Sequence, residues 1–348
     1  MNAMQYDIRQ TRALITWPMV IVFALFATMP YWIVQVGLYE YLAVEILIWA
    51  IFALGFNLLL GYTGLPSFGH GAFFGIGAYV FGLAQFQVWS NLWFCLFAAM
   101  AVTAAVGAAS ALFLSHRRGI YFALMSIAIG QIFFFIASKW TDVTGGEDGL
   151  LNIQRLPAHF GVFEFSTASN TGLYYLTFGI FVVTTLILWR LTNSPYGRIL
   201  RAIKQNETRV AFVGHSVWFY KWTVFTLSCA TSGLSGGLFA MAQEGAYINV
   251  MSLQWSGIIV LMVLIGGGFV SFWGPLLGVA LYFVARDVLG AYTEAWLLWF
   301  GLMFMLLVMF KPEGLAGIVR DVSRGSWWRR PGSGVPAQCD VATPVRGR

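Results

Sequence analysis

The chain has 348 residues, of which 59% are hydrophobic and only 10% are charged, and its formal net charge is +6. A soluble domain carries roughly 25% charged residues, so this composition excludes an ordinary soluble protein and indicates a polytopic integral membrane protein. The basic residues do not gather into a folded domain that could bind nucleic acid. We therefore expect one all-α membrane domain and no nucleic-acid partner.

Apolar stretches between charged and turn residues predict about ten transmembrane helices, because a span needs about 20 mostly apolar residues. In chain order, the predicted spans are 14–34, 38–60, 71–88, 91–115, 120–138, 172–191, 219–243, 253–271, 273–290 and 292–310. The pairs that meet near Ser90 and near Phe272 could each be one kinked helix instead of two. These spans divide the chain into an N-terminal segment 1–13, a membrane domain 14–310 and a tail 311–348.

The charges predict the orientation. If the connections alternate between the two sides, seventeen of the twenty Lys and Arg residues fall on one side. Because basic loops stay in the cytoplasm, both termini are predicted to be cytoplasmic. The basic tail 311–348 is predicted to be disordered and to adhere to membrane lipid.

A break follows the second predicted span, where glycines, a proline and polar residues interrupt the apolar sequence between Asn57 and Tyr79. Unpaired backbone groups cost several kcal/mol each in lipid, so a broken helix must be buried in protein or line a watery cavity. A break of this kind is a pointer to a substrate path. The candidate residues of a translocation path are Asn57, Gly61, Tyr62, Gly64, Ser67, Gly69, His70 and Gly71.

Two ionisable residues in the apolar region each allow two interpretations. His70 could bind solute or act in a gate, or it could be a hydrogen-bonded structural group. Glu45 is the one acid well inside a predicted span, where it could face a cavity or a partner. Alternatively, a shifted boundary would place Glu45 beside Glu40 at the outer interface. Pairs of small residues four apart, such as Gly233 and Gly237, are expected to let helices pack closely.

The predicted external loop 139–171 is long enough to have a role of its own. It contains the glycine-rich run with Gly145, Gly146, Asp148 and Gly149. Such glycines are typical of tight turns that require a positive φ. The loop could be a gate or a surface that receives an extracellular partner, or it could be a solvated loop that its acids keep soluble.

The cytoplasmic connection 192–218 is predicted to contain a short amphipathic helix. Ser194 is a plausible N-cap with Pro195 at the first helical position, and Gly214 is placed to end the second half. One face carries Ile199, Ala202, Ile203 and Asn206. Anionic lipid could retain such a helix at the membrane surface. Alternatively, the helix could dock in a groove of a cytosolic partner.

Motifs for catalysis are missing from the sequence. It has no phosphate-binding loop of the Gly-x-x-x-x-Gly-Lys-Ser/Thr type and no His-Glu-x-x-His helix. The three cysteines have no pair spacing that suggests a disulfide or zinc site. We therefore expect no catalytic residues, no cofactor and no metal. Three classes stay open: a transport subunit driven by external ATP hydrolysis, an ion-coupled secondary transporter and, with least support, a membrane enzyme.

Five motifs occur in an order that resembles a known family. They are Asn57 to Tyr79, Gly145 to Leu150, Ser194 to Gly214, Leu264 to Gly268 with Trp273-Gly274-Pro275, and Phe310 to Leu315. Together they are similar to the branched-chain amino acid ABC transporter permeases of the LivM subfamily, over roughly residues 40–318.

The resemblance implies a type II ABC importer-like permease of the bacterial inner membrane that forms half of a translocation path. The implied partners are a homologous permease, two cytosolic ABC ATPase subunits that hydrolyse ATP, and a periplasmic solute-binding protein. Within this family the solute varies among branched-chain amino acids, other amino acids, urea and short amides. Whether the two permeases of one importer are identical also stays open.

Carried over by position, the family's ATPase-coupling loop corresponds here to Ser194, Gly197, Arg198, Arg201, Ala202, Ile203, Glu207 and Gly214. Val213 and His215 depart from the usual residues beside the last glycine, which leaves the identity of the ATPase open. Pro66 and Phe68 depart from the family pattern in the first motif and could alter the wall of the path.

Overall fold

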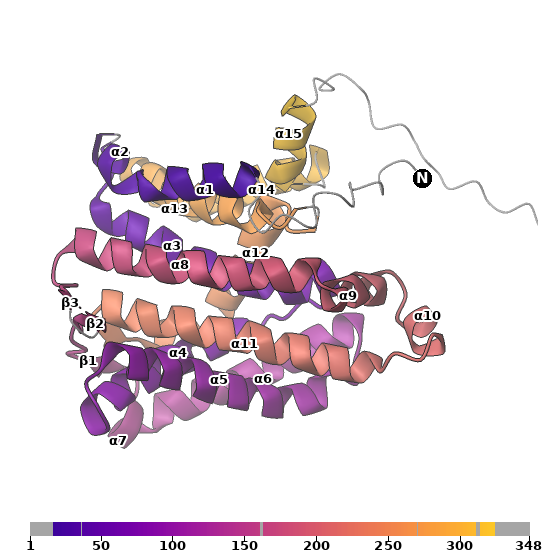
Figure 1. Ribbon diagram of the computed structural model, residues 1–348, viewed down its shortest axis with the longest axis horizontal. Helices are drawn as coiled ribbons and strands as arrows, with labels where there is room; N and C mark the ends of the chain where they lie inside the picture. Colours follow the sequence, from indigo (N-terminus) through magenta and orange to yellow (C-terminus); the bar gives the residue numbers. More distant parts are fainter. Residues whose placement is uncertain (1–16, 36, 161–162, 270, 311–313, 324–348) are drawn as a thin grey trace, which may run out of the picture.

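The computed structural model describes residues 17–35, 37–160, 163–269, 271–310 and 314–323. Long helices run side by side along one axis of a mostly helical molecule (Figure 1). The helices and helical turns are α1 Trp17–Ala27, α2 Met29–Gln35, α3 Glu40–Asn57, η2 Leu58–Tyr62, α4 His70–Gln87, α5 Leu92–Leu114, α6 Gly119–Lys139, α7 Thr141–Thr144, α8 Asn170–Asn193, α9 Pro195–Gln205, α10 Glu207–Phe212, α11 Val217–Ala242, η3 Ile248–Met251, α12 Leu253–Gly266, α13 Gly274–Tyr292, α14 Trp296–Phe310 and α15 Gly314–Ser323.

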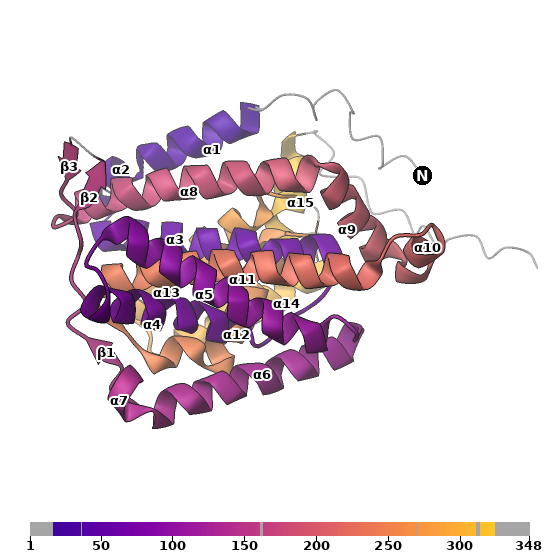
Figure 2. The same ribbon diagram turned by 60° about the horizontal axis from the view of Figure 1, so that its bottom comes forward.

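Four short strands accompany the helices, so the fold is mostly helical rather than purely α. Strand β1 (Leu150–Leu151) pairs antiparallel with β4 (Gly245–Ala246), and β2 (Ala158–Phe160) pairs antiparallel with β3 (Phe163–Phe165). Strands β1 to β3 lie at one end of the molecule and helices α9 and α10 at the other, in both views (Figures 1 and 2). We name these ends the strand end and the α9 end.

The expected count of ten spans is not confirmed. Among the described residues, six helices are long and apolar enough to cross a membrane: α3 continued by η2, α5, α6, α8, α11 and α13. Helices α12 and α14 are apolar but shorter. The segments that meet near Ser90 are separate helices, since α4 ends at Gln87 and α5 begins at Leu92; α12 and α13 are likewise separate.

The first predicted span is broken, which the hydropathy pattern did not reveal. Helix α1 ends at Ala27 and α2 starts at Met29. Pro30 lacks an N–H group, so it cannot donate to the carbonyl of Phe26 one turn earlier. The hydroxyl of Tyr174 in α8 donates to that carbonyl instead. A proline therefore breaks this apolar segment where a neighbouring helix can replace the lost hydrogen bond.

The expected disorder of the tail is wrong for residues 314–323, which form α15. The helix starts at Gly314 with a φ of +68°, against the backbone of Gly267. Close packing of this kind gives a short helix a tertiary anchor that composition alone does not predict. The remainder of the tail and the segment 1–13 lie outside the described residues.

Helices α3 and α11 form the centre of the molecule. The buried share of an apolar 18-residue stretch of each helix is 100% in α3 with η2 and 72% in α11, but only 33% in α5 and 28% in α6. Helix α6 accordingly lies at the edge of the bundle (Figure 2). Its outer face carries Ile120, Leu124, Ile132 and Phe135, all exposed, so α6 offers apolar surface to lipid or to another membrane subunit.

Glycines allow the central helices to approach closely, as the four-apart pairs predicted. A Cβ added to Gly236 of α11 would lie 2.0 Å from the carbonyl oxygen of Phe74 in α4. In the same interface, a Cβ on Gly77 would lie 2.5 Å from Cα of Gly233. Backbone atoms cannot move aside as a side chain can, so these contacts require glycine.

We expect Gly236→Ala to destabilise the protein by about 1–3 kcal/mol, because the added methyl group forces α4 and α11 apart. Thermal unfolding of the purified chain in detergent would measure the loss. Gly179→Ala in α8 is the matched control, since a Cβ there meets no atom within 4 Å. A Gly236→Ala variant as stable as Gly179→Ala would contradict this account of the α4–α11 interface.

Candidate functional site

The predicted break in the second span is present and begins as a π-helix. Helix α3 passes directly into η2, and the chain leaves it at Gly64, which has a φ of +74°. The N–H of Gly64 donates to Leu60 at 3.1 Å, and that of Leu65 donates to Leu59 at 3.1 Å. Single π turns inside helices occur frequently at functional sites. Gly64 supplies the left-handed conformation that ends the helix.

Pro66 explains why this helix cannot continue. In a π-helix the N–H of residue i+5 bonds to the carbonyl of residue i, and Pro66 stands five residues after Gly61 without an N–H. The ammonium of Lys204 in α9 donates to the Gly61 carbonyl instead, at 2.8 Å. Partial burial lowers the pKa of Lys204 from its usual value. The Gly61 carbonyl favours the charged form of Lys204, and so does the ring of Phe269, whose centre lies 4.3 Å from Nζ.

After the break, the chain turns into α4 inside the helical bundle. A Cβ on Gly69 would lie 1.9 Å from the carbonyl oxygen of Ser126 in α6, and His70 lies beside Ser228 of α11. Ser126 and Ser228 are roughly two turns into α6 and roughly three turns into α11. The non-helical segment 64–69 therefore lies within the length of helices that can cross a membrane.

His70 is a structural group in this arrangement. Its Nδ1 lies 3.3 Å from Oγ of Ser67 and its Nε2 lies 2.9 Å from Oγ of Ser228. The side chain is fully buried, and its ring contacts Phe52, Phe56, Phe73 and Phe225. The two serines satisfy both ring nitrogens, which fixes the entry of the chain into α4. A third hydrogen bond holds the start of α4, since the N–H of Gly71 donates to Oγ of Ser256 at 3.0 Å.

Asn57 is a buried polar side chain at the end of α3, directly before the π-helix η2. It is 1% exposed, and neither polar atom of its amide has a hydrogen-bond partner within the described part of the chain. The amide fits between two glycines, because a Cβ on Gly61 or Gly268 would lie 2.0 or 2.4 Å from its Oδ1. A buried amide without partners is costly.

The structure brings the eight predicted path residues into one region without exposing most of them. Tyr62 and Gly64 are half-buried, and the other six are buried: Asn57, Gly61, Ser67, Gly69, His70 and Gly71. From Gly61 to Phe68 buried and half-buried residues alternate. One side of this segment, with Tyr62, Gly64, Pro66 and Phe68, is therefore partly accessible.

A second break lies against the first. Helix α12 ends at Gly266 and is followed by Gly267, which has a φ of +85°; α13 begins only at Gly274. The carbonyl of Gly268 approaches Gly61, where an added Cβ would lie 2.7 Å from it. Gly314 packs on Gly267 from the other side. Four of the five sequence motifs thus meet at one place, close to α9.

The connection 192–218 forms two helices where the sequence predicted one helix in two halves. Ser194 occupies the N-cap position of α9 with Pro195 at the first position, as predicted, although the Ser194 hydroxyl donates to the Leu191 carbonyl. Asn206 interrupts the helix because its side chain caps α10, accepting from the N–H of Arg209 at 3.0 Å. Gly214 follows α10 with a φ of +91°.

Glu207 and Arg201 point back to the body of the protein. The Glu207 carboxylate lies 2.6 Å from Nζ of Lys221 in α11 and 2.5 Å from Nε of Arg118 in the connection before α6. Arg201 donates to the carbonyl of Thr192 at 3.2 Å. On α9, Gly197 and Ile203 are buried, whereas Arg198 and Arg201 are exposed. The predicted coupling residues therefore divide into internal anchors and surface residues.

The exposed sides of α9 and α10 enclose a groove of about 550 Å³. It is lined by Arg198, Ile199, Ala202, Gln205, Asn206, Arg209, Val210, Val213 and His215. Four of these residues are apolar and two are arginines. This chemistry suits an apolar side chain flanked by carboxylates.

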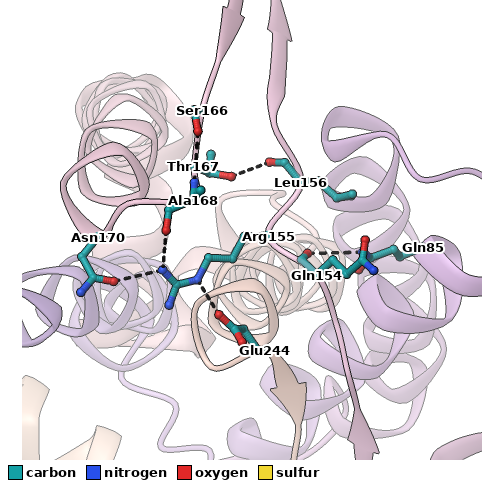
Figure 3. Close-up of polar contacts among 9 residues, drawn as sticks. All are labelled: Gln85, Gln154, Arg155, Leu156, Ser166, Thr167, Ala168, Asn170 and Glu244. Carbon is teal, nitrogen blue, oxygen red and sulfur yellow. Dashed lines mark hydrogen bonds and ion pairs between the residues drawn. The ribbon is translucent and has the colours of Figure 1, made fainter.

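The strand end is held together by Arg155 (Figure 3). Its guanidinium donates to Oδ1 of Asn170 at 3.0 Å and pairs with Glu244 at 2.9 Å, and so joins the loop to α8 and to the end of α11. Gly145, Gly146 and Gly149 have positive φ values of +75°, +67° and +78°, which confirms the predicted tight turns. Asp148 is exposed beside them.

Glu45 is neither free nor at the very end of its helix. It lies five residues after Glu40, at which α3 begins, and only 6% of it is exposed. Arg286 of α13 binds both carboxylate oxygens, at 3.1 and 2.8 Å. The pair cancels the charge that would be costly in the apolar interior.

Sequence reasoning missed three cations that hold the site together: Lys204, Arg155 and Arg286. For Lys204 a signal was present, because a proline five residues after Gly61 leaves that carbonyl in need of a donor. No comparable local signal identifies the partners of Arg155 and Arg286.

These features define a multi-pass helical membrane protein with paired breaks inside the bundle and a groove on short helices at one end. The chain belongs to the family described as branched-chain amino acid transport system / permease component, which matches residues 38–311. This membership confirms the predicted class, a transport permease.

The chain is also similar to curated proteins that are named as permeases of this family. The chain is 29% identical over 301 residues to the high-affinity branched-chain amino acid transport system permease protein LivM of Salmonella typhimurium, covering 80% of this chain and 70% of that protein. It is 29% identical over 296 residues to LivM of Escherichia coli, with coverages of 79% and 69%. It is 26% identical over 288 residues to the permease protein BraD of Pseudomonas aeruginosa, with coverages of 77% and 91%. No solved structure matches the chain.

Proposed function

We propose that this chain is one of two permease subunits of an ATP-binding cassette importer for branched-chain amino acids in a bacterial inner membrane. Two cytosolic ATPase subunits would drive it and a periplasmic binding protein would deliver the solute. Both the α9 end and the chain termini would face the cytoplasm. The described residues support this orientation, since Arg117, Arg118 and the basic residues of α9 and α10 lie at the α9 end.

The observation that carries the proposal is the exposed groove of α9 and α10, together with the anchors that fix it to the bundle. A helix held only by lipid needs an apolar face and basic residues, but it needs no defined concavity. This groove instead is a concave surface lined by apolar residues and by two arginines. It suits a folded cytosolic partner that presents an apolar side chain between carboxylates.

The translocation path would run along the partly accessible side of the break. Tyr62 and Gly64, with Pro66 and Phe68, would face it, and the second permease would complete the wall. The buried members of the predicted set, from Asn57 to Gly71, would shape the break from behind. At the other end, Asp148 beside its rigid glycine turns would form part of the surface that receives the binding protein.

An ion-coupled secondary transporter is less well supported. Such a carrier needs an intramembrane ionisable group that can exchange a proton or a sodium ion. Glu45 was the candidate, and both of its oxygens are bound by Arg286. Catalysis of ATP hydrolysis is assigned to the partner subunits, and this chain is proposed to act as a transport subunit and not as an enzyme.

The test is ATP-dependent uptake by proteoliposomes that hold this chain with its partners and binding protein loaded with labelled leucine or urea. Uptake of leucine would support the proposed solute, whereas uptake of urea alone would reassign it. Ala202→Trp fills the groove and should reduce uptake and stimulated ATP hydrolysis about tenfold or more. Lys139→Met, an exposed change at the end of α6, is the control. Uptake by this chain alone, driven by an ion gradient, would refute the proposal.

A further inference from the structure

Lys204 connects α9, which carries the groove, to both breaks, the one that begins at η2 and the one between α12 and α13. It belongs to α9, yet its ammonium donates to the Gly61 carbonyl at 2.8 Å and lies 4.3 Å from the centre of the Phe269 ring. Its aliphatic part passes over Gly64, where a Cβ would lie 3.1 Å from Cγ of Lys204. One side chain therefore contacts η2, the turn after it and the turn between α12 and α13.

The Gly61 carbonyl depends on this contact. Pro66 cannot supply the N–H that a continued π-helix would use, so the ammonium takes the place of the backbone donor. A charged donor makes a stronger hydrogen bond than a neutral one. Any movement of α9 relative to α3 must stretch or break this bond, or else move Gly61 with it.

The other cations near α9 are held differently. Arg201 bonds to carbonyls of Gly197 and Thr192, within its own helix and the end of α8, and its guanidinium lies 5.8 Å from the centre of the Tyr62 ring in η2. Lys221 is paired with Glu207 and bonds to the carbonyl of Arg117 at 3.2 Å. The Lys221 contacts hold α10 to α11, and Arg201 reaches the ring of Tyr62, whereas Lys204 bonds to the backbone of the break itself.

We propose that Lys204 is a positioning residue that transmits movement of α9 to the paired breaks at Gly61 and Phe269, and so couples ATP hydrolysis by the partner to opening of the path. This inference rests on the proposed function. A π turn can change its hydrogen-bond register without unfolding the helix, which makes η2 a suitable element to be switched. The buried amide of Asn57 next to Gly61 would acquire a partner when this register changes.

The experiment compares uptake and ATP hydrolysis in the same proteoliposomes, with the complete complex and loaded binding protein. Lys204→Met keeps the length of the side chain but removes the donor. We expect assembly and ATP hydrolysis to persist while uptake per ATP falls about tenfold. Lys204→Arg, which restores a cationic donor, should recover most of the lost uptake. Phe269→Leu removes only the ring contact. It should also lower uptake per ATP hydrolysed, but by a smaller factor than Lys204→Met.

Two outcomes would overturn the inference. An unchanged ratio of uptake to hydrolysis in Lys204→Met would show that the contact transmits nothing. Equal loss of uptake, hydrolysis and assembly, without recovery in Lys204→Arg, would show that Lys204 only stabilises the fold. Failure of the proposed function is seen separately, because the unmodified complex would then show no ATP-driven uptake before any variant is made.

Discussion

Replacing Arg286 with Met should be among the most destabilising single changes in the described part of the chain. Glu45 is 6% exposed, and both of its oxygens depend on the Arg286 guanidinium. Removal of one partner from a buried pair leaves an uncompensated charge and costs about 3–5 kcal/mol. Thermal or denaturant unfolding of the purified chain in detergent should measure a loss of this size for Arg286→Met.

The double variant Glu45→Gln/Arg286→Met tests the reason. If the unpaired charge causes the loss, removal of both charges should recover most of the stability. Lys139→Met removes an exposed cation at the end of α6 and should have little effect. A double variant no more stable than Arg286→Met would show that packing of the arginine, and not the charge, was lost.

Glu207→Ala should have a comparable effect at the other end of the molecule. The side chain of Lys221 is 1% exposed and is paired with Glu207 at 2.6 Å. Without the carboxylate a buried ammonium is left with the carbonyl of Arg117, which should cost about 3–5 kcal/mol. Because α10 begins at Glu207, the same change should release α10 and distort the docking groove. Unfolding in detergent and ATP-dependent uptake would both report the loss.

The chain offers a matched control on the same carboxylate. Arg118 also pairs with Glu207, but 61% of its side chain is exposed, so Arg118→Ala should cost no more than about 1 kcal/mol. The double variant Glu207→Leu/Lys221→Met should recover stability by replacing the buried pair with apolar groups. If Arg118→Ala were as harmful as Glu207→Ala, the buried lysine could not be the cause. Recovery of stability without recovery of uptake would show that Glu207 also acts in docking.

The local features of the site could be predicted from the sequence. Gly145 and Gly214 both adopt a positive φ, and helix α9 begins at Pro195, as predicted. These outcomes depend on neighbouring residues alone, because glycine lacks the Cβ that excludes this conformation and proline favours the first helical position. The small residues were correctly assigned to packing. The order of the motifs also gave the family, which the match over residues 38–311 confirms.

The number of spans and the state of the tail were predicted less well. Hydropathy alone treats 14–34 as one span, although Pro30 breaks it into α1 and α2. Hydropathy also predicts a full span over 253–271, whereas α12 stops at Gly266 because glycines follow. Helix α15 is fixed by its packing on Gly267, a contact that the composition of the tail cannot indicate.

By itself, the sequence determined the membrane class, the position of the break and the tight glycine turns of the loop 139–171. Only the tertiary structure decided which helices meet, and therefore that Lys204 reaches Gly61 across 143 positions of the chain and that Arg286 neutralises Glu45 across 241. The physical reason is that apolar periodicity places a helix in the membrane without selecting its neighbour. That choice depends on backbone approach at glycines and on the pairing of buried charges, which are properties of two helices together.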